Sequence, residues 1–484
     1  MGLKVSDSRK VVNEFMNEIT PDSIPTRGER VKLQIQGFNH AGEGVARLGG
    51  LAVFVEGALP GEIVEAEITE VRRRYGRAKT VAVLQRAVGR VEPLCGLHFG
   101  CGGCRLQHVD YPTQLELKTK LVGDSLERIG RFLEPPVRPI IGMANPRHYR
   151  NKVHYQVARI GEQVVLGFFE EDSYNMRPLG LDESGVEHCL LPDQRLFRVA
   201  SAVQILLNEY QVPVYDWDKG SGYLRHVVLR LAVGTGEVMV ILACGNGEWP
   251  ACAAFTTALL DTAPEVRSVV ENINQSPGRE VLGNRNLAMA GASTITDELG
   301  GLKLRISPSS FYQVNPAQTL PLYEQVLAYS ALTGRETVVD VFSGIGTIAL
   351  FLARQARQVY GLEIVPEAVA DAKENASLNG IQNVEFQRGR AEELLPALAQ
   401  QGLRPDVVIL DPPRRGCAES VLDAVLVMNP GRIVYVSCDL GTMARDLRFL
   451  AASGYHLAQV QPVDMFPFTT HVECVALVVL NQDR

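Results

Sequence analysis

The 484-residue sequence lacks a long apolar run, a signal peptide and an excess of positive charge. No stretch approaches the roughly 18 consecutive apolar residues that a membrane helix needs, and the polar N-terminus has no apolar signal core. We therefore expect a cytoplasmic protein with no membrane segment. The formal net charge of −7 argues against a surface coated with basic residues, but it still permits a local basic patch that binds nucleic acid.

Disulfide bonds are not expected either, because thiols stay reduced in the cytoplasm. The nine cysteines are instead candidates for metal binding or catalysis. Cys95, Cys101 and Cys104 are spaced C-x5-C-x2-C, and Cys189 is the best candidate for a fourth ligand. By count, four thiolates suit zinc and an iron–sulfur cluster equally well. The C-x3-C-x2-C spacing of radical enzymes is absent, so radical chemistry is not inferred.

The length allows two to four domains, and the pattern of the sequence changes along the chain. Residues 1–25 are polar and predict a flexible tail. Residues 26–86 contain short alternating strands between glycine-rich turns, which is typical of a small β-barrel. Residues 87–305 predict a central α/β domain that carries the four cysteines, with an amphipathic helix at 111–133 that can pack on the catalytic domain. Residues 306–484 predict a second α/β domain, which is the catalytic domain.

Two basic stretches are candidates for contacts with nucleic acid. The last hairpin of the barrel, Arg72 to Lys79, mixes arginines with Tyr75, which suits phosphate contacts and base stacking. A solvated charged turn explains the same residues equally well. The stretch Arg147 to Lys152 is also basic and aromatic, and it either lines an RNA path or caps a strand.

The catalytic half contains the pattern of an adenosine cofactor site. A buried strand, ETVVDVF, leads into a turn with Gly344 and Gly346, and the next strand ends in Glu363. Glycines let the backbone approach a ligand, and the acidic residue can bond ribose hydroxyls. By itself this pattern also fits an NAD-dependent dehydrogenase.

A fourth strand of this half ends in Asp411, followed by Pro-Pro-Arg. In class I methyltransferases this strand often ends in an acidic or amide residue followed by Pro-Pro, beside the methyl group that is transferred. Methylases that act on amines usually have Asn-Pro-Pro-Tyr at this place. The sequence therefore favours a methyltransferase over a dehydrogenase, with an acceptor other than an amine.

Cys438 and Glu473 are the candidate catalytic pair. A buried strand at Arg432–Ser437 breaks at Cys438 and becomes a helix by about Met443. A helix N-terminus lowers the pKa of a nearby thiol and makes it a better nucleophile, although a lone cysteine is more often an inert core residue. Glu473 enters an apolar strand, where a carboxylate is costly unless it has a partner or a task.

A thiol, a carboxylate and a methyl donor suit methylation at carbon 5 of a pyrimidine. That carbon is too weak a nucleophile to take a methyl group unaided, but a thiolate that adds to carbon 6 activates it. A base then removes the carbon 5 proton, and the thiolate leaves. The target base has to flip out of its stack to reach such a pocket.

These motifs resemble the RNA 5-methyluridine methyltransferases that modify bacterial ribosomal and transfer RNA. The resemblance covers nearly everything from about residue 27 and depends on HFGCGGCRLQH, FYQVNP, DVFSGIGT, LDPPRRGC, SCDLGTMARDL and HVECV. The barrel resembles the TRAM domain, an RNA-binding barrel, through GEGVAR and FVEGALPGE. The resemblance implies an OB-like barrel, a central α/β region and a C-terminal Rossmann-like class I methyltransferase sheet.

The resemblance also implies roles for individual residues. Contacts to S-adenosylmethionine fall on Gln313, Phe342, Glu363 and Asp411, the nucleophile is Cys438 and the base is Glu473. Cys95, Cys101, Cys104 and Cys189 match the ligands of a 4Fe–4S cluster, which is preferred over zinc on this ground alone.

We expect a monomer that modifies 23S ribosomal RNA, with transfer RNA as the alternative substrate. Family members often have Pro where this chain has Leu440, and Cys where it has Ser343, which affects only the assignment to a subfamily. A further alternative is an RNA-binding protein whose methyltransferase domain has lost its activity. That alternative predicts that the nucleophile or the base is missing, and both residues are present in the sequence.

Overall fold

A computed structural model describes residues 25–96, 98–170, 173, 175–178, 189–276, 278 and 280–481. Apart from Pro25, the predicted tail lies outside the described residues. The chain divides into two compact units, and each is assembled from separate segments. The first unit comprises residues 1–94, 103–117 and 468–470; the second comprises residues 95–102, 118–467 and 471–484.

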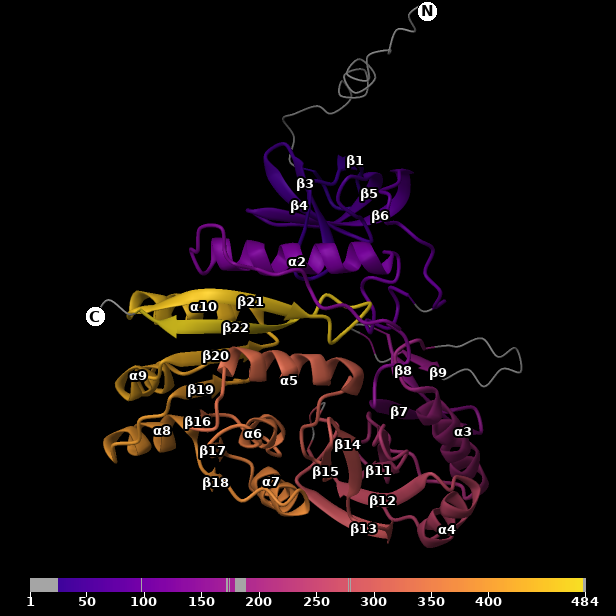
Figure 1. Cartoon of the computed structure of the whole chain (residues 1–484). Helices are drawn as coiled ribbons and strands as arrows, with labels where there is room; N and C mark the ends of the chain where they lie inside the picture. The colour runs from indigo at the N-terminus through magenta and orange to yellow at the C-terminus, as the bar shows by residue number, and fades with distance from the viewer. Residues whose placement is uncertain are drawn as a thin grey trace, which may run out of the picture. The chain divides into compact units, whose positions relative to one another are not determined.

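The strands of the first unit form a six-stranded sheet in the order β1-β5-β6-β4-β3-β2, as expected for the barrel (Figure 1). Its strands are β1 (Arg30–Gln34), β2 (Gly37–Phe38), β3 (Glu43–Leu48), β4 (Leu51–Glu56), β5 (Ile63–Val71) and β6 (Tyr75–Gln85). Buried and more exposed residues alternate along β5, which is the pattern of a strand with one face on a core. That core includes Leu33, Val53, Val64 and Ile68.

A segment from the far end of the chain completes the first unit. The backbone N–H groups of Arg105 and Leu106 donate to the carbonyl oxygen of Phe468, both at 2.9 Å. The Phe468 N–H donates in turn to Oε1 of the buried Gln114, also at 2.9 Å. These bonds satisfy backbone groups in a part of the unit that has no regular strand.

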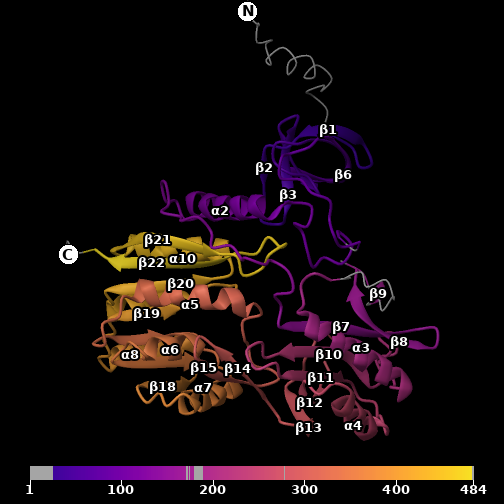
Figure 2. The same ribbon diagram turned by 45° about the vertical axis from the view of Figure 1, so that its right-hand side comes forward.

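The central part of the second unit has a seven-stranded sheet in the order β13-β12-β11-β10-β7-β8-β9. Helices α3 and α4 cover one face of it, with Leu196, Val203 and Phe255 in the shared core (Figures 1 and 2). The elements are β7 (Lys152–Ile160), β8 (Gln163–Phe169), β9 (Met176–Pro178), α3 (Gln194–Glu209), β10 (Leu224–Leu231), β11 (Val238–Cys244), α4 (Cys252–Thr262), β12 (Val266–Ile273) and β13 (Arg285–Gly291). A separate hairpin follows, β14 (Ile295–Leu299) and β15 (Leu302–Ile306).

The C-terminal part of the second unit has another seven-stranded sheet, in the order β18-β17-β16-β19-β20-β22-β21. The first five of these strands are parallel, and β22 and β21 are antiparallel to their neighbours. The elements are α5 (Pro316–Ser330), β16 (Thr337–Asp340), α6 (Thr347–Ala353), β17 (Gln358–Glu363), α7 (Pro366–Leu378), β18 (Val384–Arg388), α8 (Ala391–Gln400), β19 (Val407–Leu410), α9 (Glu419–Met428), β20 (Arg432–Ser437), α10 (Leu440–Ala452), β21 (Tyr455–Val463) and β22 (Glu473–Leu480).

Helices cover both faces of this sheet, so its central strands are apolar on both sides. Val338, Val407 and Val434 pack in one core cluster with residues of α5, α6 and α7. Their sequence neighbours Val339 and Val408 pack in the other cluster with residues of α8, α9 and α10. Because both faces of these strands are buried, the sequence of each strand is an uninterrupted apolar run.

Helix α2 (Tyr111–Arg128) ends five residues before the predicted end. Gly130 follows it, and Arg131 has a positive φ of 62°, which a continuing right-handed helix does not permit. The last part of α2 lies in the second unit, where Val122 and Leu126 join the core cluster of the C-terminal sheet, as expected. In the part of the chain that the structure describes, no helix has both the length and the apolar character to cross a bilayer.

Candidate active site

The candidate residues meet at one edge of the C-terminal sheet, where its parallel strands end. Asp340 is the last residue of β16, and Glu363 is the last residue of β17. Asp411 directly follows β19, and Cys438 directly follows β20. The carboxyl ends of parallel strands are where ligands bind in open α/β sheets. The strand ends therefore gather three carboxyl groups and the thiol.

The antiparallel pairing of β20 with β22 brings Glu473 to the same edge. Ser437 pairs with Cys474, so the register continued by one residue places Cys438 opposite Glu473. Opposite residues of an antiparallel pair have Cβ atoms about 5 Å apart. The Glu473 side chain is only 5% exposed, whereas Cys438 is half-buried. The predicted nucleophile and base thus lie side by side.

The expected activation of Cys438 by a helix N-terminus is wrong for the ligand-free protein. Its pKa is raised to about 11, first by burial and then by the charges of Glu473 and Asp411. Helix α10 begins at Leu440, earlier than predicted, and its N-cap Asp439 accepts a hydrogen bond from the Thr442 N–H at 2.8 Å. That carboxylate satisfies an N–H of the first turn, and it places negative charge at the positive end of the helix.

Burial disfavours the charged form of Glu473 and Asp411 at this edge. Burial, and then the Asp411 charge, raise the pKa of Glu473 well above its usual value. Burial also raises the pKa of Asp411, to about 6. Arg414 opposes these effects, because its charge lowers the pKa of Glu473, and its charge and a hydrogen bond lower the pKa of Cys438. An added cation would therefore bind well here and favour the ionised carboxylates.

Sequence reasoning did not single out Asp340, which is fully buried and contributes to the same site. Burial, and then the charges of Asp411 and Glu363, raise its pKa to about 8. Neither carboxyl oxygen has a well-formed hydrogen bond to a described residue. The sequence signal for Asp340 is its place at the end of a buried strand, just before the glycine turn.

Tyr323 on α5 is a second residue that sequence reasoning missed. Its hydroxyl lies 3.0 Å from Thr347 Oγ1, at the start of α6. Burial raises its pKa, and the charges of Asp411, Asp340 and Glu473 raise it as well. Tyr323 therefore lies near three of the carboxyl groups at this edge.

The glycine turn and Glu363 are joined directly. Glu363 Oε2 accepts a hydrogen bond from the Gly344 N–H at 3.0 Å, and Oε1 accepts one from Val365 at 2.8 Å. Gly346 has a φ of 84°, and a Cβ at this position would lie 2.7 Å from the Phe386 ring. The turn thus requires glycine for both conformation and space.

The central part of the second unit holds the segment that carries Gln313. The Asn151 side chain donates to the Gln313 carbonyl oxygen at 3.0 Å, and the Asn151 N–H donates to Val314 at 2.9 Å. The buried Arg230 side chain donates to the carbonyl oxygens of Ser307, Pro308 and Ser310. At least one residue of the basic stretch before β7 therefore has a structural task at the cofactor edge. Phe342, after β16, is half-buried against the core.

The four cysteines predicted to bind a cluster form no disulfide bonds in the described structure, and neither do the other five. The pKa of Cys189 is raised to about 11, mainly by burial, and charges on Cys101 and Cys95 add to the effect. These three thiols therefore lie in one neighbourhood of the second unit, whereas Cys104 belongs to the first. Among the described residues, no group of three or more His, Cys, Asp or Glu side chains is placed to hold a metal ion.

The basic hairpin of the first unit is the turn between β5 and β6. Arg73 and Arg74 are exposed at its tip. Arg72 pairs with Glu70, and Arg77 pairs with Glu43 at 3.1 Å.

The residues at the sheet edge fit S-adenosylmethionine. A buried carboxyl without a hydrogen bond, a second carboxyl with a raised pKa, and a glycine turn tied to Glu363 suit a cationic ligand with a ribose. Counted from β16, the strand order is 3-2-1-4-5-7-6, with the glycine turn after strand one and the acidic residue at the end of strand two. Fold and site together define a class I methyltransferase.

Comparisons with known proteins give the family. The sequence profile of the tRNA (uracil-5-)-methyltransferase family matches residues 299–481, and that of the TRAM domain matches residues 26–81. An RNA methyltransferase of Caldanaerobacter subterraneus is 47% identical over 93% of this chain and 98% of its own length. One from Halalkalibacterium halodurans is 44% identical over 94% of this chain and 98% of its own length.

A solved structure agrees with this grouping. It is the Pyrococcus abyssi tRNA (uracil-54, C5)-methyltransferase in complex with S-adenosyl-L-homocysteine, with a TM-score of 0.72 and 25% identity over 93% of this chain and 100% of that one. The chain therefore belongs to the tRNA (uracil-5-)-methyltransferase family and carries a TRAM domain. It is an S-adenosylmethionine-dependent RNA methyltransferase.

Proposed function

We propose that the protein forms 5-methyluridine in RNA through a covalent bond between Cys438 and the target base. The observation that carries this proposal is the register of β20 and β22: its last pair is Ser437 with Cys474, so Cys438 and the buried Glu473 are the next residue on each chain segment. A thiol and a carboxylate side by side, next to a site for a methyl donor, provide a nucleophile for carbon 6 and a base for carbon 5. S-adenosylmethionine, when bound, supplies the methyl group and a positive sulfonium charge.

The reaction then requires two proton transfers: one from the Cys438 thiol and one from carbon 5 of the base. The Cys438 thiol releases its proton to solvent, and Sγ bonds to carbon 6 of the uracil. The electrons of the broken C5–C6 π bond pass into an enolate, which makes carbon 5 nucleophilic. After carbon 5 is methylated, its proton passes to the Glu473 carboxylate, and the electron pair left behind breaks the bond between Sγ and carbon 6. Because the pKa of Glu473 is well above its usual value, the ionised side chain is a stronger base than an ordinary carboxylate.

Arg414 is the described cation that acts on both catalytic groups. It lowers the pKa of Cys438 by a hydrogen bond and by its charge, and it lowers the pKa of Glu473 by its charge. Without it, burial and the Asp411 charge would disfavour the ionised form of both groups still more. Arg414 therefore helps to keep a reactive fraction of each.

We propose large-subunit ribosomal RNA as the substrate, because the barrel and the four cysteines resemble the enzymes that act on it. Transfer RNA is the second candidate, and it is favoured by the likeness to the Pyrococcus abyssi enzyme over that enzyme's whole chain. Mapping 5-methyluridine by mass spectrometry in RNA from a strain without this protein distinguishes the two. The nucleoside missing from 23S RNA or from transfer RNA identifies the substrate.

Two variants test the mechanism, because each residue has its own step. Cys438→Ala cannot add to carbon 6, so we expect no methyl transfer and no adduct. Glu473→Gln retains the thiol but lacks the base, so the enzyme should remain bonded to methylated RNA. Denaturing electrophoresis then shows a protein band shifted by the attached RNA.

Cys474→Ala is the matched control, since this thiol lies next to Glu473 in β22 but is buried in the core. It should methylate RNA without a trapped band. Methylation by Cys438→Ala would disprove the covalent role of this thiol. A Glu473→Gln variant that binds both ligands and gives no shifted band would show that Glu473 is not the proton acceptor.

We also propose, from the resemblance alone, that Cys95, Cys101, Cys104 and Cys189 bind a 4Fe–4S cluster. The described residues do not form a metal-binding group in this arrangement, so no step of the reaction is assigned to a cluster. Iron and sulfide analysis of protein purified without oxygen tests the proposal. Zinc without iron would contradict it.

A further inference from the structure

The loop between β19 and α9, residues 411–418, carries both Asp411 and Arg414. The conformation of this loop therefore sets the distance of both charges from Cys438, and with it their effect on the pKa of the thiol. Arg414 is exposed, and its charge lowers the pKa of the Cys438 thiol. Its backbone lies close to the residue that follows Cys438, because Thr442 Oγ1 contacts both the Arg414 carbonyl oxygen and Asp439 Oδ1, each at 3.1 Å. One backbone bond within the loop is the Gly416 N–H to the Pro413 carbonyl oxygen at 2.8 Å. A loop of this length does not fix the place of Arg414 by itself, so the contacts made to its backbone matter.

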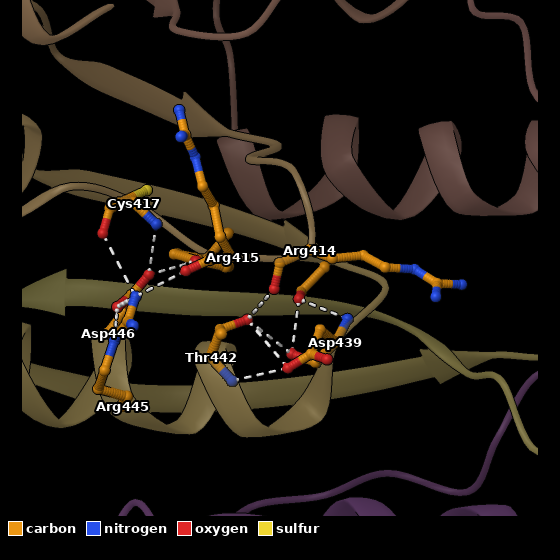
Figure 3. A network of polar contacts seen from close by, with 9 residues as sticks. Arg414, Arg415, Cys417, Asp439, Thr442, Arg445 and Asp446 are labelled. Atoms are coloured by element: carbon orange, nitrogen blue, oxygen red, sulfur yellow. Dashed lines mark hydrogen bonds and ion pairs between the residues drawn. The ribbon is translucent and has the colours of Figure 1, made fainter. Parts of the chain in front are cut away.

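Three side chains of helix α10 reach the backbone of this loop (Figure 3). Thr442 Oγ1 donates to the Arg414 carbonyl oxygen at 3.1 Å. Arg445 Nη2 donates to the carbonyl oxygens of Arg415 at 3.1 Å and Cys417 at 3.3 Å. The Cys417 N–H donates to Asp446 Oδ2 at 2.8 Å. Three residues of the loop, Arg414, Arg415 and Cys417, are thus bonded to side chains near the start of the helix.

Asp446 is the centre of these contacts. Its side chain is 1% exposed, yet it accepts hydrogen bonds from the Cys417 N–H, from the Tyr435 hydroxyl at 2.6 Å and from Arg445 Nε at 2.8 Å. A buried carboxylate is costly unless its oxygens are satisfied in this way. The same charge orients Arg445 toward the loop, so Asp446 acts on the loop both directly and through Arg445.

The packing of Gly416 is an independent sign that the loop is pressed onto these side chains. Its φ is 76°, and a Cβ at this position would lie 2.5 Å from Arg445 Nη2 and 2.7 Å from Asp446 Oδ2. Only glycine permits so close an approach of backbone to side chain. The loop therefore has little room to move away from α10.

We propose that Asp446 is a positioning residue for the methyl transfer: together with Arg445 it holds the 411–418 loop against α10 and so keeps Arg414 beside Cys438. This inference rests on the proposed nucleophilic role of Cys438. Asp446 does not touch the reacting atoms, and it acts through the loop. The fraction of Cys438 in the thiolate form then depends on the Asp446 carboxylate of helix α10.

The test measures the Cys438 thiol directly, without RNA or cofactor. Alkylation of Cys438 by iodoacetamide is followed by peptide mass spectrometry as a function of pH in wild type, Asp446→Asn and Arg414→Gln. We expect both variants to shift the pH midpoint upward by about one unit, which is a tenfold lower thiolate fraction. The double variant should shift no further than Arg414→Gln alone, because both changes act on the thiol through the Arg414 charge.

Tyr435→Phe is the matched control. It removes one hydrogen bond from the Asp446 carboxylate but leaves the bond from Cys417 in place, so the protein should melt at a lower temperature with the Cys438 titration unchanged. Thr442→Ala removes only the bond to the Arg414 carbonyl oxygen, and it should shift the midpoint in the same direction by a smaller amount. This variant keeps the test available if Asp446→Asn does not fold.

In turnover with RNA, Asp446→Asn should lower kcat about tenfold and change KM less than twofold. Loss of stability with a wild-type Cys438 titration would overturn the proposal and leave Asp446 a purely structural role. A wild-type titration in Arg414→Gln would overturn it as well. The failure of the proposed function appears separately, as methylation by Cys438→Ala, and it would not alter the alkylation result.

Discussion

The buried Asp340 carboxyl gives a prediction about stability that can be worked out from its surroundings. Its pKa is raised to about 8, compared with 3.8 for an ordinary aspartate. Between these two pH values the folded protein holds a proton on Asp340 that the unfolded chain has lost. The group thus contributes stability that is fully present below pH 3.8 and is lost as the pH rises through 8. The expected slope is roughly 1.4 kcal/mol per pH unit.

Asp340→Asn replaces the carboxyl group with an amide of nearly the same shape that does not titrate. Folding of the variant therefore involves no uptake of a proton at this position. The variant should gain stability relative to wild type as the pH rises from 5 to 8, by up to roughly 4 kcal/mol over that range. The assay is urea unfolding of the ligand-free protein at each pH, scored as the difference between the two proteins. S-adenosylmethionine should flatten the wild-type curve, because a bound cation lowers the pKa of Asp340.

Asp216→Asn is the matched control, since Asp216 is only partly buried and its pKa is lowered, mainly by a hydrogen bond from Lys219. Asp216 titrates only below this pH range in both the folded and the unfolded chain. The difference in stability between Asp216→Asn and wild type should therefore stay constant between pH 5 and 8. A constant difference for Asp340→Asn as well would refute the reasoning. It would mean that the Asp340 carboxyl titrates at an ordinary pH in the folded protein.

Three further predictions concern other parts of the chain. Gly346→Ala should destabilise the protein by about 1–3 kcal/mol, seen by urea unfolding, and abolish cofactor binding by calorimetry, because of its positive φ and the nearby Phe386. Changing both Arg73 and Arg74 to Gln should weaken RNA binding and lower its salt dependence by about one unit of slope for each lost phosphate contact, while cofactor affinity stays unchanged; an unchanged slope would contradict this role. Cys104→Ala should lose iron and melt at a lower temperature, and full iron content in this variant would exclude Cys104 as a ligand.

Local patterns in the sequence predicted the elements that bear the site. Strand β20 spans Arg432–Ser437 as expected, and β22 begins at Glu473. Apolar runs and turn signals act within a few residues, so they can be recognised without knowledge of the fold. The end of α2 was misplaced because the positive φ of Arg131 is not marked by residue type.

The electrostatics of the site could not be predicted in the same way. The helix N-terminus beside Cys438 is a local feature and suggested a low pKa, whereas burial and carboxyl groups from other strands raise the pKa of this thiol. Asp411 and Glu473 are distant in sequence from one another, and only the strand order brings them together. The contacts of Asp446 with the 411–418 loop depend on the packing of α10 in the same way.

The membership of residues 468–470 in the first unit has a consequence for the order of folding. The hydrogen bonds between Phe468 and the segment from Arg105 to Gln114 join parts of the chain from its two ends. During synthesis, the N-terminal barrel leaves the ribosome long before the residues that complete its unit exist. A nascent chain stopped before Phe468 should thus have an incomplete N-terminal unit, and a cut at the apparent boundary near residue 94 would leave the N-terminal piece without residues 103–117 and 468–470 of its own unit.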